Sequence, residues 1–220
     1  MALILNIDTA VDVASLCLAK DGKVLSIAKN ESLKDHASWL HIAIKEVFEK
    51  NSLELRSVDA IAVTGGPGSY TGLRIGMATA KGICYPLNKP LISLNTLLVM
   101  ANAAKDESAD LLCPMIDARR MEVFAAIYTK ELEIVKDPVA ITLSENSFAE
   151  YLSNNSICFF GNGSKKFQAI EKSSQAFFVE IKTDALSMIS LSEKSFSEKK
   201  FADLAYAEPL YLKEFYTPSK

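Results

Sequence analysis

A glycine-rich segment from Gly65 to Gly72 is the part of the chain whose residue types could best hold a small ligand. It follows an apolar run at 58–64 that predicts a buried strand, and it leads into a run at 71–85 that predicts a helix. Backbone N–H groups at such a junction can bind a phosphate, and glycines let the ligand approach closely. A nucleotide site near Gly66 and Gly68 is therefore the first hypothesis.

Known nucleotide-binding motifs are not met in this segment. A P-loop places Lys and then Ser or Thr after its last glycine, whereas Leu73 and Arg74 follow Gly72 here. The dinucleotide fingerprint needs a third glycine at the position that Thr71 occupies. These departures weaken the nucleotide hypothesis.

Two aspartates end strands that hold equivalent places in the two halves of the chain. Asp8 ends the first expected strand, at 3–8, and Asp117 follows the first strand of the second half, at 111–116. If both faced one cleft, they would suit Mg²⁺-assisted phosphate chemistry. The turn after Asp117, at 118–120, reads Ala-Arg-Arg and lacks the glycines of a phosphate-binding hairpin. A hydrogen-bonded strand end is therefore the favoured role for each aspartate, and proximity to a nucleotide is the alternative.

Residue combinations typical of catalysis or metal binding are scarce. The only two histidines, His36 and His41, lie five residues apart on one expected helix, so they diverge by about 140° and cannot chelate one metal. No serine lies in a Gly-x-Ser-x-Gly motif. None of the four cysteines belongs to a CxxC pair, and buried free thiols are favoured for Cys17, Cys84, Cys113 and Cys158. The sequence predicts no catalytic residue and no metal site.

Two expected helices carry faces that could pack inside the protein or against a partner. Gly72, Gly76 and Ala80 recur every four residues and share one face of the helix at 71–85, where missing side chains let another helix approach closely. A partner helix is favoured there, and packing on the chain's own sheet is the alternative. For the apolar stripe of a helix at 36–50 the two interpretations are equally favoured. The stripe consists of His36, Trp39, Leu40, Ala43, Ile44, Val47 and Phe48.

The elements that position these residues describe an α/β protein in two similar halves. Each half begins with strands joined by tight turns and then alternates helix with strand, which is the order of a ribonuclease-H-like unit. Asp21-Gly22 predicts a hairpin turn, and the polar stretch 105–110 is the best boundary. Further strands are expected at 13–19, 24–29, 91–93, 122–128, 135–141 and 157–160. Helices are expected at 95–104, where Asn95 is the predicted cap, and at 147–152, 164 onward, 185–191 and 201–206, and an extended segment is expected at 208–220.

Composition narrows the class of protein. The 220 residues are 49% hydrophobic and 23% charged, so a well-buried core is expected. A net charge of −3 argues against a domain built mainly to grip nucleic acid, although contact with RNA inside an assembly is compatible with it. No apolar run approaches the ~20 residues that span a bilayer, and the N-terminus lacks a basic leader, so a cytoplasmic protein is expected.

Three stretches, at 4–10, 66–76 and 116–123, together with Pro-Leu-Tyr-Leu at 209–212, resemble the TsaB (YeaZ) family of bacterial tRNA-modification proteins. The resemblance implies an actin-like ATPase (ASKHA) fold, made of two ribonuclease-H-like domains with mixed sheets flanked by helices. Residues 1–107 would form the first domain, which carries the partner-binding helices. Residues 108–220 would form a second, reduced domain, whose C-terminal segment either stays there or packs back onto the first.

The resemblance also implies a function and partners. TsaB proteins assist TsaD, which transfers threonylcarbamoyl to adenosine 37 of tRNA, in an assembly with the ATPase TsaE. A heterodimer with TsaD is expected, and tRNA would be reached only through the complex. The chain is expected to have no cofactor of its own, although ADP or ATP would bind at or near the TsaD interface. A homodimer is an alternative state of the isolated chain. The interface that the resemblance implies consists of His36, Trp39, Leu40, Ala43, Ser69, Tyr70, Thr71, Gly72, Leu73, Arg74, Gly76 and Ala80.

Departures from TsaD imply a catalytically silent paralogue. TsaD carries two metal-binding histidines after the strand that follows its glycine-rich helix, and the corresponding residues 94–100 contain none. Residues 117–120 replace the glycine-rich phosphate hairpin, and the C-terminal adenosine motif has no counterpart. An independent actin-like ATPase or kinase is the alternative, and an M22-type glycoprotease is less favoured.

Overall fold

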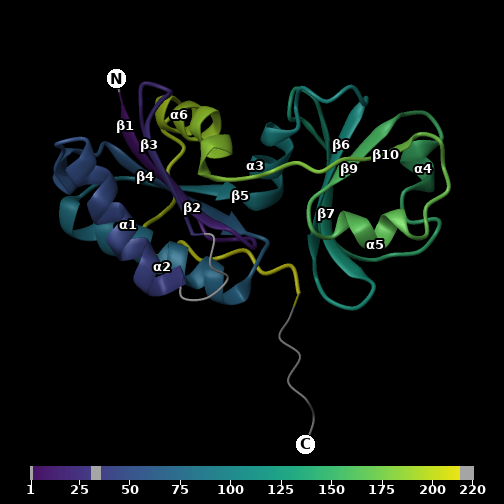
Figure 1. The fold of residues 1–220 in the computed structure, drawn as a ribbon, viewed down its shortest axis with the longest axis horizontal. Coiled ribbons are helices and arrows are strands. Elements are labelled where there is room, and N and C mark those ends of the chain that lie inside the picture. The colour runs from purple at the N-terminus through teal and green to yellow at the C-terminus, as the bar shows by residue number, and fades with distance from the viewer. Residues whose placement is uncertain (1, 31–35, 214–220) are drawn as a thin grey trace, which may run out of the picture.

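The computed structural model describes residues 2–30 and 36–213, with His36 described through its backbone alone. Two lobes lie side by side, each built on a mixed sheet (Figure 1). The first sheet has the strand order β3-β2-β1-β4-β5, in which β1, β2 and β3 are antiparallel and β1, β4 and β5 are parallel. Its strands are β1 (Leu3–Asp8), β2 (Ala14–Lys20), β3 (Lys23–Asn30), β4 (Ala60–Gly66) and β5 (Leu91–Asn95).

The second sheet repeats the topology of the first. Its order is β10-β9-β6-β7-β8, with β6, β7 and β8 antiparallel and β6, β9 and β10 parallel. The strands are β6 (Leu111–Asp117), β7 (Glu122–Thr129), β8 (Ile134–Thr142), β9 (Ile157–Phe160) and β10 (Ala176–Phe178). Counted from the antiparallel edge, both sheets have two antiparallel strand pairs followed by two parallel ones. The duplicated ribonuclease-H-like unit predicted from the amino-acid sequence is therefore confirmed.

Helices cover both faces of the first sheet and are short in the second lobe, which is the reduced copy (Figure 1). On one face of the first sheet lie α1 (His36–Lys50) and α2 (Tyr70–Leu87), and on the other lie α3 (Thr96–Ala103), η2 (Ala185–Met188) and α6 (Ile189–Ser197). The second lobe carries α4 (Ala149–Leu152) and α5 (Ser164–Gln168), and η1 (Leu55–Ser57) precedes β4. Within the described residues, no helix is long and apolar enough to cross a membrane.

Local sequence explains the turns and helix ends. Asp21 and Gly22 adopt φ values of 52° and 72°, as a tight hairpin turn between β2 and β3 requires. The side chain of Ser69 accepts a hydrogen bond from the N–H of Gly72 and caps α2. Asn95 accepts from the N–H groups of residues 97 and 98 at the start of α3, which confirms its predicted capping role.

One hydrophobic cluster joins the two lobes through α3. Its residues Leu97 and Met100 pack with Ile116 of β6 and Phe160 of β9, although α3 also covers the first sheet through Val99. The lobes therefore share buried apolar surface as well as chain connections.

The chain does not divide into two continuous halves after residue 107. Ala185 and Met188 of η2 pack on the first sheet, and the N–H of Leu210 bonds to the carbonyl of Gly65 at 2.7 Å. Residues 185–207, which the prediction placed in the second domain, thus pack on the first lobe. Residues 208–213 follow the alternative that the C-terminal segment packs back onto the first domain. Residues 214–220 of the predicted extended segment lie outside the described residues.

The helix predicted at 201–206 is also wrong. The N–H of Ala202 bonds to the carbonyl of Leu91 at 2.8 Å, which extends the edge of the first sheet instead. The Asp203 side chain then accepts the N–H groups of Ala205 and Tyr206. Such local bonds offer the backbone an alternative to a helix.

Candidate functional site

The small-residue face of α2 points into the protein. A Cβ atom added at Gly72 would overlap the carbonyl oxygen of Thr9, and one at Gly76 would overlap the Thr9 hydroxyl and lie 3.2 Å from the Val63 side chain. Ala80 is fully buried. The prediction that this face receives a partner helix is therefore wrong, because the face allows α2 to pack closely on β4 and on the turn after β1.

The apolar stripe of α1 also faces the chain's own sheet. Leu40 and Ala43 are buried in the cluster that joins α1, α2 and the first sheet, Leu73 of α2 is buried, and Trp39 is half-buried against the same cluster. These side chains stabilise the first lobe, so assigning Leu40, Ala43 and Leu73 to an exposed interface is a second error. The side chain of His36 lies outside the described residues.

The outward face of α2 is instead formed by residues 71, 74, 78, 82 and 85, and it also has small side chains near its centre. Ala78 is exposed, and a Cβ atom added at Gly82 would meet no atom within 4 Å. Tyr85 is 81% exposed, and Ile42 on neighbouring α1 is 57% exposed. Sequence reasoning missed this face, although the four-residue spacing of Ala78 and Gly82 signals it. Of the predicted interface, Ser69, Thr71 and Arg74 are exposed and Tyr70 is half-buried.

Asp8 is fully buried at the end of β1. Its Oδ1 accepts the hydroxyl of Thr64 at 2.9 Å and the N–H of Ala10 at 3.1 Å, while its Oδ2 has no hydrogen-bond partner within the described part of the chain. Burial raises the pKa of this carboxyl, and the two hydrogen bonds only partly oppose that effect. The residue therefore fits the hydrogen-bonded strand end.

Replacing Asp8 with asparagine tests this role. The folded protein favours the protonated form of Asp8. The stability that protonated Asp8 contributes is therefore fully present below the pKa of 3.8 in the unfolded chain, and it is lost as pH rises through the higher pKa of Asp8 in the folded protein. We expect Asp8→Asn to match the wild type within about 1 kcal/mol near pH 4, and to be the more stable protein at pH 7. Urea denaturation at both pH values measures the difference in unfolding free energy between the two proteins. All other acidic side chains are present in both proteins, so their titration cancels in this difference. A stability difference that does not change with pH would contradict the assignment.

Asp117 is in a different environment at the end of β6. Its Oδ1 accepts the Lys166 ammonium at 2.8 Å and the N–H of Arg119 at 2.6 Å. Partial burial alone would raise the pKa of Asp117, but these two donors outweigh it and lower the pKa. Asp117 is thus ionised and engaged, and Asp8 and Asp117 do not share a solvent-filled site.

Two cavities lie between the lobes. One of about 690 Å³ is lined by Val11 and Asp12 after β1, by Asn162 before α5, and by the linker at 178–184. Asn162 donates to Asp12 across this boundary at 2.9 Å. Neither Asp8 nor Asp117 lines it, so the two-aspartate arrangement expected of an ATPase cleft is not formed.

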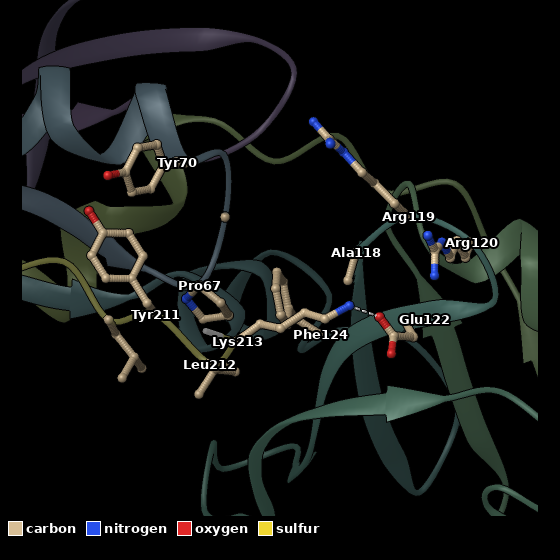
Figure 2. Close-up of a pocket in the computed structure, with 12 residues that line it drawn as sticks. Pro67, Tyr70, Ala118, Arg119, Arg120, Glu122, Phe124, Tyr211, Leu212 and Lys213 are labelled. Carbon is tan, nitrogen blue, oxygen red and sulfur yellow. Dashed lines mark hydrogen bonds and ion pairs between the residues drawn. The ribbon is translucent and has the colours of Figure 1, made fainter. Parts of the chain in front are cut away.

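The other cavity, of about 430 Å³, lies where α2, the β6–β7 hairpin and the C-terminal segment meet (Figure 2). Gly68 of the glycine-rich turn lines it, whereas Gly66 is covered by the backbone of Leu210. The remaining lining residues are Pro67, Tyr70, Ala118, Arg119, Arg120, Glu122, Phe124, Leu210, Tyr211, Leu212 and Lys213.

The cysteines are poorly suited to nucleophilic chemistry. All four are buried and free, as expected. Burial raises the pKa of Cys17 and Cys158 to about 12 and of Cys84 to about 11, so the thiolate is disfavoured. Over residues 2–30 and 36–213, no group of three or more histidine, cysteine or acidic side chains is placed to hold a metal ion.

Comparison with known proteins agrees with this architecture. A family model described as TsaD, tRNA N6-adenosine threonylcarbamoyltransferase, matches residues 26–215. The "tRNA threonylcarbamoyladenosine biosynthesis protein TsaB" of Buchnera aphidicola subsp. Baizongia pistaciae is 31% identical over 170 residues, which cover 74% of this chain and 76% of that protein. TsaB of Escherichia coli is 33% identical over 129 residues, covering 58% of this chain and 55% of the relative.

Solved structures support the fold independently. YeaZ from Pseudomonas aeruginosa superposes with a TM-score of 0.80 at 23% identity, over 96% of this chain and 100% of that one. The duplicated topology and the matching family model define an actin-like-fold protein of the TsaD type. Within that class, the chain belongs to the TsaB family, also called YeaZ.

Proposed function

We propose that this chain takes part in threonylcarbamoyladenosine biosynthesis on tRNA as a subunit that docks onto a TsaD-type partner, with no transfer chemistry of its own. Membership of the TsaB family supports the pathway. The burial of Asp8 and of the four thiols supports a silent role, because the residues that could do chemistry are committed to the interior.

The outward face of α1 and α2 is the observation that carries the docking proposal. Ile42 and Tyr85 expose apolar surface, and large exposed apolar side chains beside small ones favour close helix packing. Ala78 and Gly82 contribute little or no side chain and have no internal packing role comparable to that of Gly72. A helix of the partner can therefore approach α2 closely between Ile42 and Tyr85.

Replacing Gly82 with leucine should block this approach without disturbing the fold. We expect the affinity for the TsaD paralogue to fall at least about 10-fold, as for a modest interface hot spot. Lys194→Leu is the matched control, because it adds the same side chain to an exposed position of α6, on the opposite face of the sheet. Calorimetric titration of each variant with the paralogue measures the effect.

Two results would contradict the docking proposal. Equal affinities of the Gly82→Leu and Lys194→Leu proteins would place the interface elsewhere. No complex with the wild type, in the absence or presence of ATP, ADP and TsaE, would remove it altogether. The same titrations test the proposed nucleotide at or near the interface, and light scattering of the chain alone tests the homodimer.

An independent ATPase or kinase is the second candidate. The cavity of about 690 Å³ between the lobes has room for a nucleotide. Such an enzyme would need an acidic side chain to hold Mg²⁺ beside the nucleotide, but Asp8, the candidate for this role, is fully buried and does not line the cavity. ATP turnover by the isolated chain that is lost in Asp8→Asn would favour this candidate over the docking subunit.

A further inference from the structure

Arginine is used sparingly and is concentrated at one place. The chain has four arginines against twenty lysines, and Arg74, Arg119 and Arg120 all lie at the cavity of about 430 Å³ or on the tyrosines that line it. Lysine provides most of the solvated positive charges of this protein, and Arg56 is the one arginine that lies away from the cavity. The planar guanidinium is the side chain that suits phosphate and aromatic rings, so its concentration here points to a ligand with both.

The two arginines of the β6–β7 hairpin are held in an unfavourable backbone conformation. Arg119 and Arg120 have φ values of 69° and 50°, in the left-handed region where Asn or Gly is preferred. A turn that needed only to connect the strands would use those residues at lower cost. Among the described residues, Arg119 and Arg120 form no ion pair. Asp117 and Glu122 act on their guanidiniums only through longer-range charge interaction, and each of these acids is itself paired with a lysine.

Aromatic rings face the same cavity. The rings of Tyr70 and Tyr211 lie 5.3 Å apart between centroids, and Tyr211 is 41% exposed. The Arg74 guanidinium lies 4.0 Å from the Tyr70 ring centroid, and its Nε–H donates to the Tyr211 hydroxyl at 3.2 Å. Arg74 therefore holds both rings in place, and an ordered ring with an exposed surface is a platform on which a base can stack.

The acidic group of the cavity is already neutralised. Glu122 pairs with Lys213, which reaches it from the C-terminal segment of the first lobe (Figure 2). The guanidiniums of Arg119 and Arg120 thus set the charge of the site, in a protein whose net charge is −3. Figure 2 shows their side chains directed apart, which suits successive phosphates of a strand better than the clustered phosphates of one small molecule.

We propose that this cavity binds an unpaired stretch of a nucleic-acid strand, with its phosphates on Arg119 and Arg120 and a base against the exposed ring of Tyr211. The choice of RNA as that strand rests on the proposed function. Only an unpaired base offers its face to an aromatic side chain, so a loop or an end is recognised and a duplex is not. The site adjoins the α1–α2 face proposed for the protein partner and shares Arg74 with it, whereas the hairpin arginines and Tyr211 lie outside that face. It gives the chain a direct RNA contact instead of access only through a complex.

Fluorescence anisotropy tests the proposal with the chain alone, so the result does not depend on docking. The ligand is a fluorescein-labelled RNA hairpin with an unpaired loop, titrated at several salt concentrations. We expect Arg119→Gln/Arg120→Gln to bind about 10-fold more weakly and to reduce the slope of log K against log salt by about 1.4, since each single-strand phosphate contact contributes ~0.7. Tyr211→Ala should weaken binding about 10-fold with an unchanged slope.

Controls separate this site from general charge attraction. Arg56→Gln removes an exposed arginine of η1 that pairs with Glu54, and it should bind like the wild type. A paired RNA duplex should bind more weakly than the hairpin. Thermal melting of each variant excludes loss of fold as the cause of weaker binding.

Three results would overturn the assignment. Absence of hairpin binding by the wild type at low salt is the first. The second is equal binding of the RNA by the Arg119→Gln/Arg120→Gln protein and the Arg56→Gln protein. The third is binding of ATP or AMP, lost in the double variant, without any binding of RNA, which would assign the cavity to free nucleotides.

Discussion

Replacing Gly72 with alanine is expected to lower the free energy of unfolding by about 2–3 kcal/mol, even though alanine is the better helix former. The added Cβ would overlap the carbonyl oxygen of Thr9, and backbone cannot move aside as the end of a flexible side chain can. The Thr9 hydroxyl also donates to the Gly72 carbonyl at 2.7 Å, so a shift of α2 would break that bond as well.

Gly82→Ala is the matched control for Gly72→Ala, because both positions lie inside α2. A Cβ atom at Gly82 meets nothing within 4 Å, so alanine there should raise the free energy of unfolding by up to about 1 kcal/mol. Urea denaturation of the two variants measures a predicted difference of about 2–4 kcal/mol. Similar stabilities would mean that the small-residue face does not pack on Thr9.

This pair of glycines shows what periodicity can and cannot predict. A four-residue spacing tells which residues share a helix face, and it correctly groups Gly72 with Gly76 and Ala80. It does not tell which way the face points, because the same helix carries a second small-residue pair, Ala78 and Gly82, on its other side. The direction is decided by the contact between Gly72 and Thr9, which are far apart in sequence.

Elements with strong local signals were predicted well. The strand at 3–8 and the strand at 157–160 have the predicted bounds, and the turn at Asp21-Gly22 and the Asn95 cap are confirmed. Each depends on local side-chain chemistry or on an uninterrupted apolar run. The short edge strand β10 was missed, since its pairing with β9 is set by the sheet and not by its own pattern.

The cavity of about 430 Å³ could not be foreseen from sequence. Its walls come from residues 67–70, 118–124 and 210–213, three segments that only the folded chain brings together. The sequence did show that Arg119 and Arg120 replace the glycines of a phosphate-binding hairpin. What it could not show is that the C-terminal segment returns across the first lobe and places Tyr211 and Lys213 opposite them.

Phe159→Ala is expected to cost about 3–5 kcal/mol, the usual range for a large aromatic side chain in a core. Phe159 is fully buried in β9, with its ring centroid 5.0 Å from that of Phe167 and 5.3 Å from those of Phe148 and Phe178. Phe177→Ala on neighbouring β10 is the matched control. That ring is 49% exposed, so its loss should cost no more than about 1 kcal/mol.

Phe159→Ala also reports whether the two lobes unfold together. Cys158 and Phe160, on the other face of β9, pack in the cluster that contains Leu97 and Met100 of α3. Because α3 also covers the first sheet, destabilising the core of the second lobe should destabilise the first lobe as well. Trp39 is the only tryptophan and lies in the first lobe, so its fluorescence follows that lobe while circular dichroism follows both. We expect Phe159→Ala to move both urea midpoints downward together. A Trp39 midpoint that stays at the wild-type value while the dichroism transition splits would show that α3 does not couple the lobes.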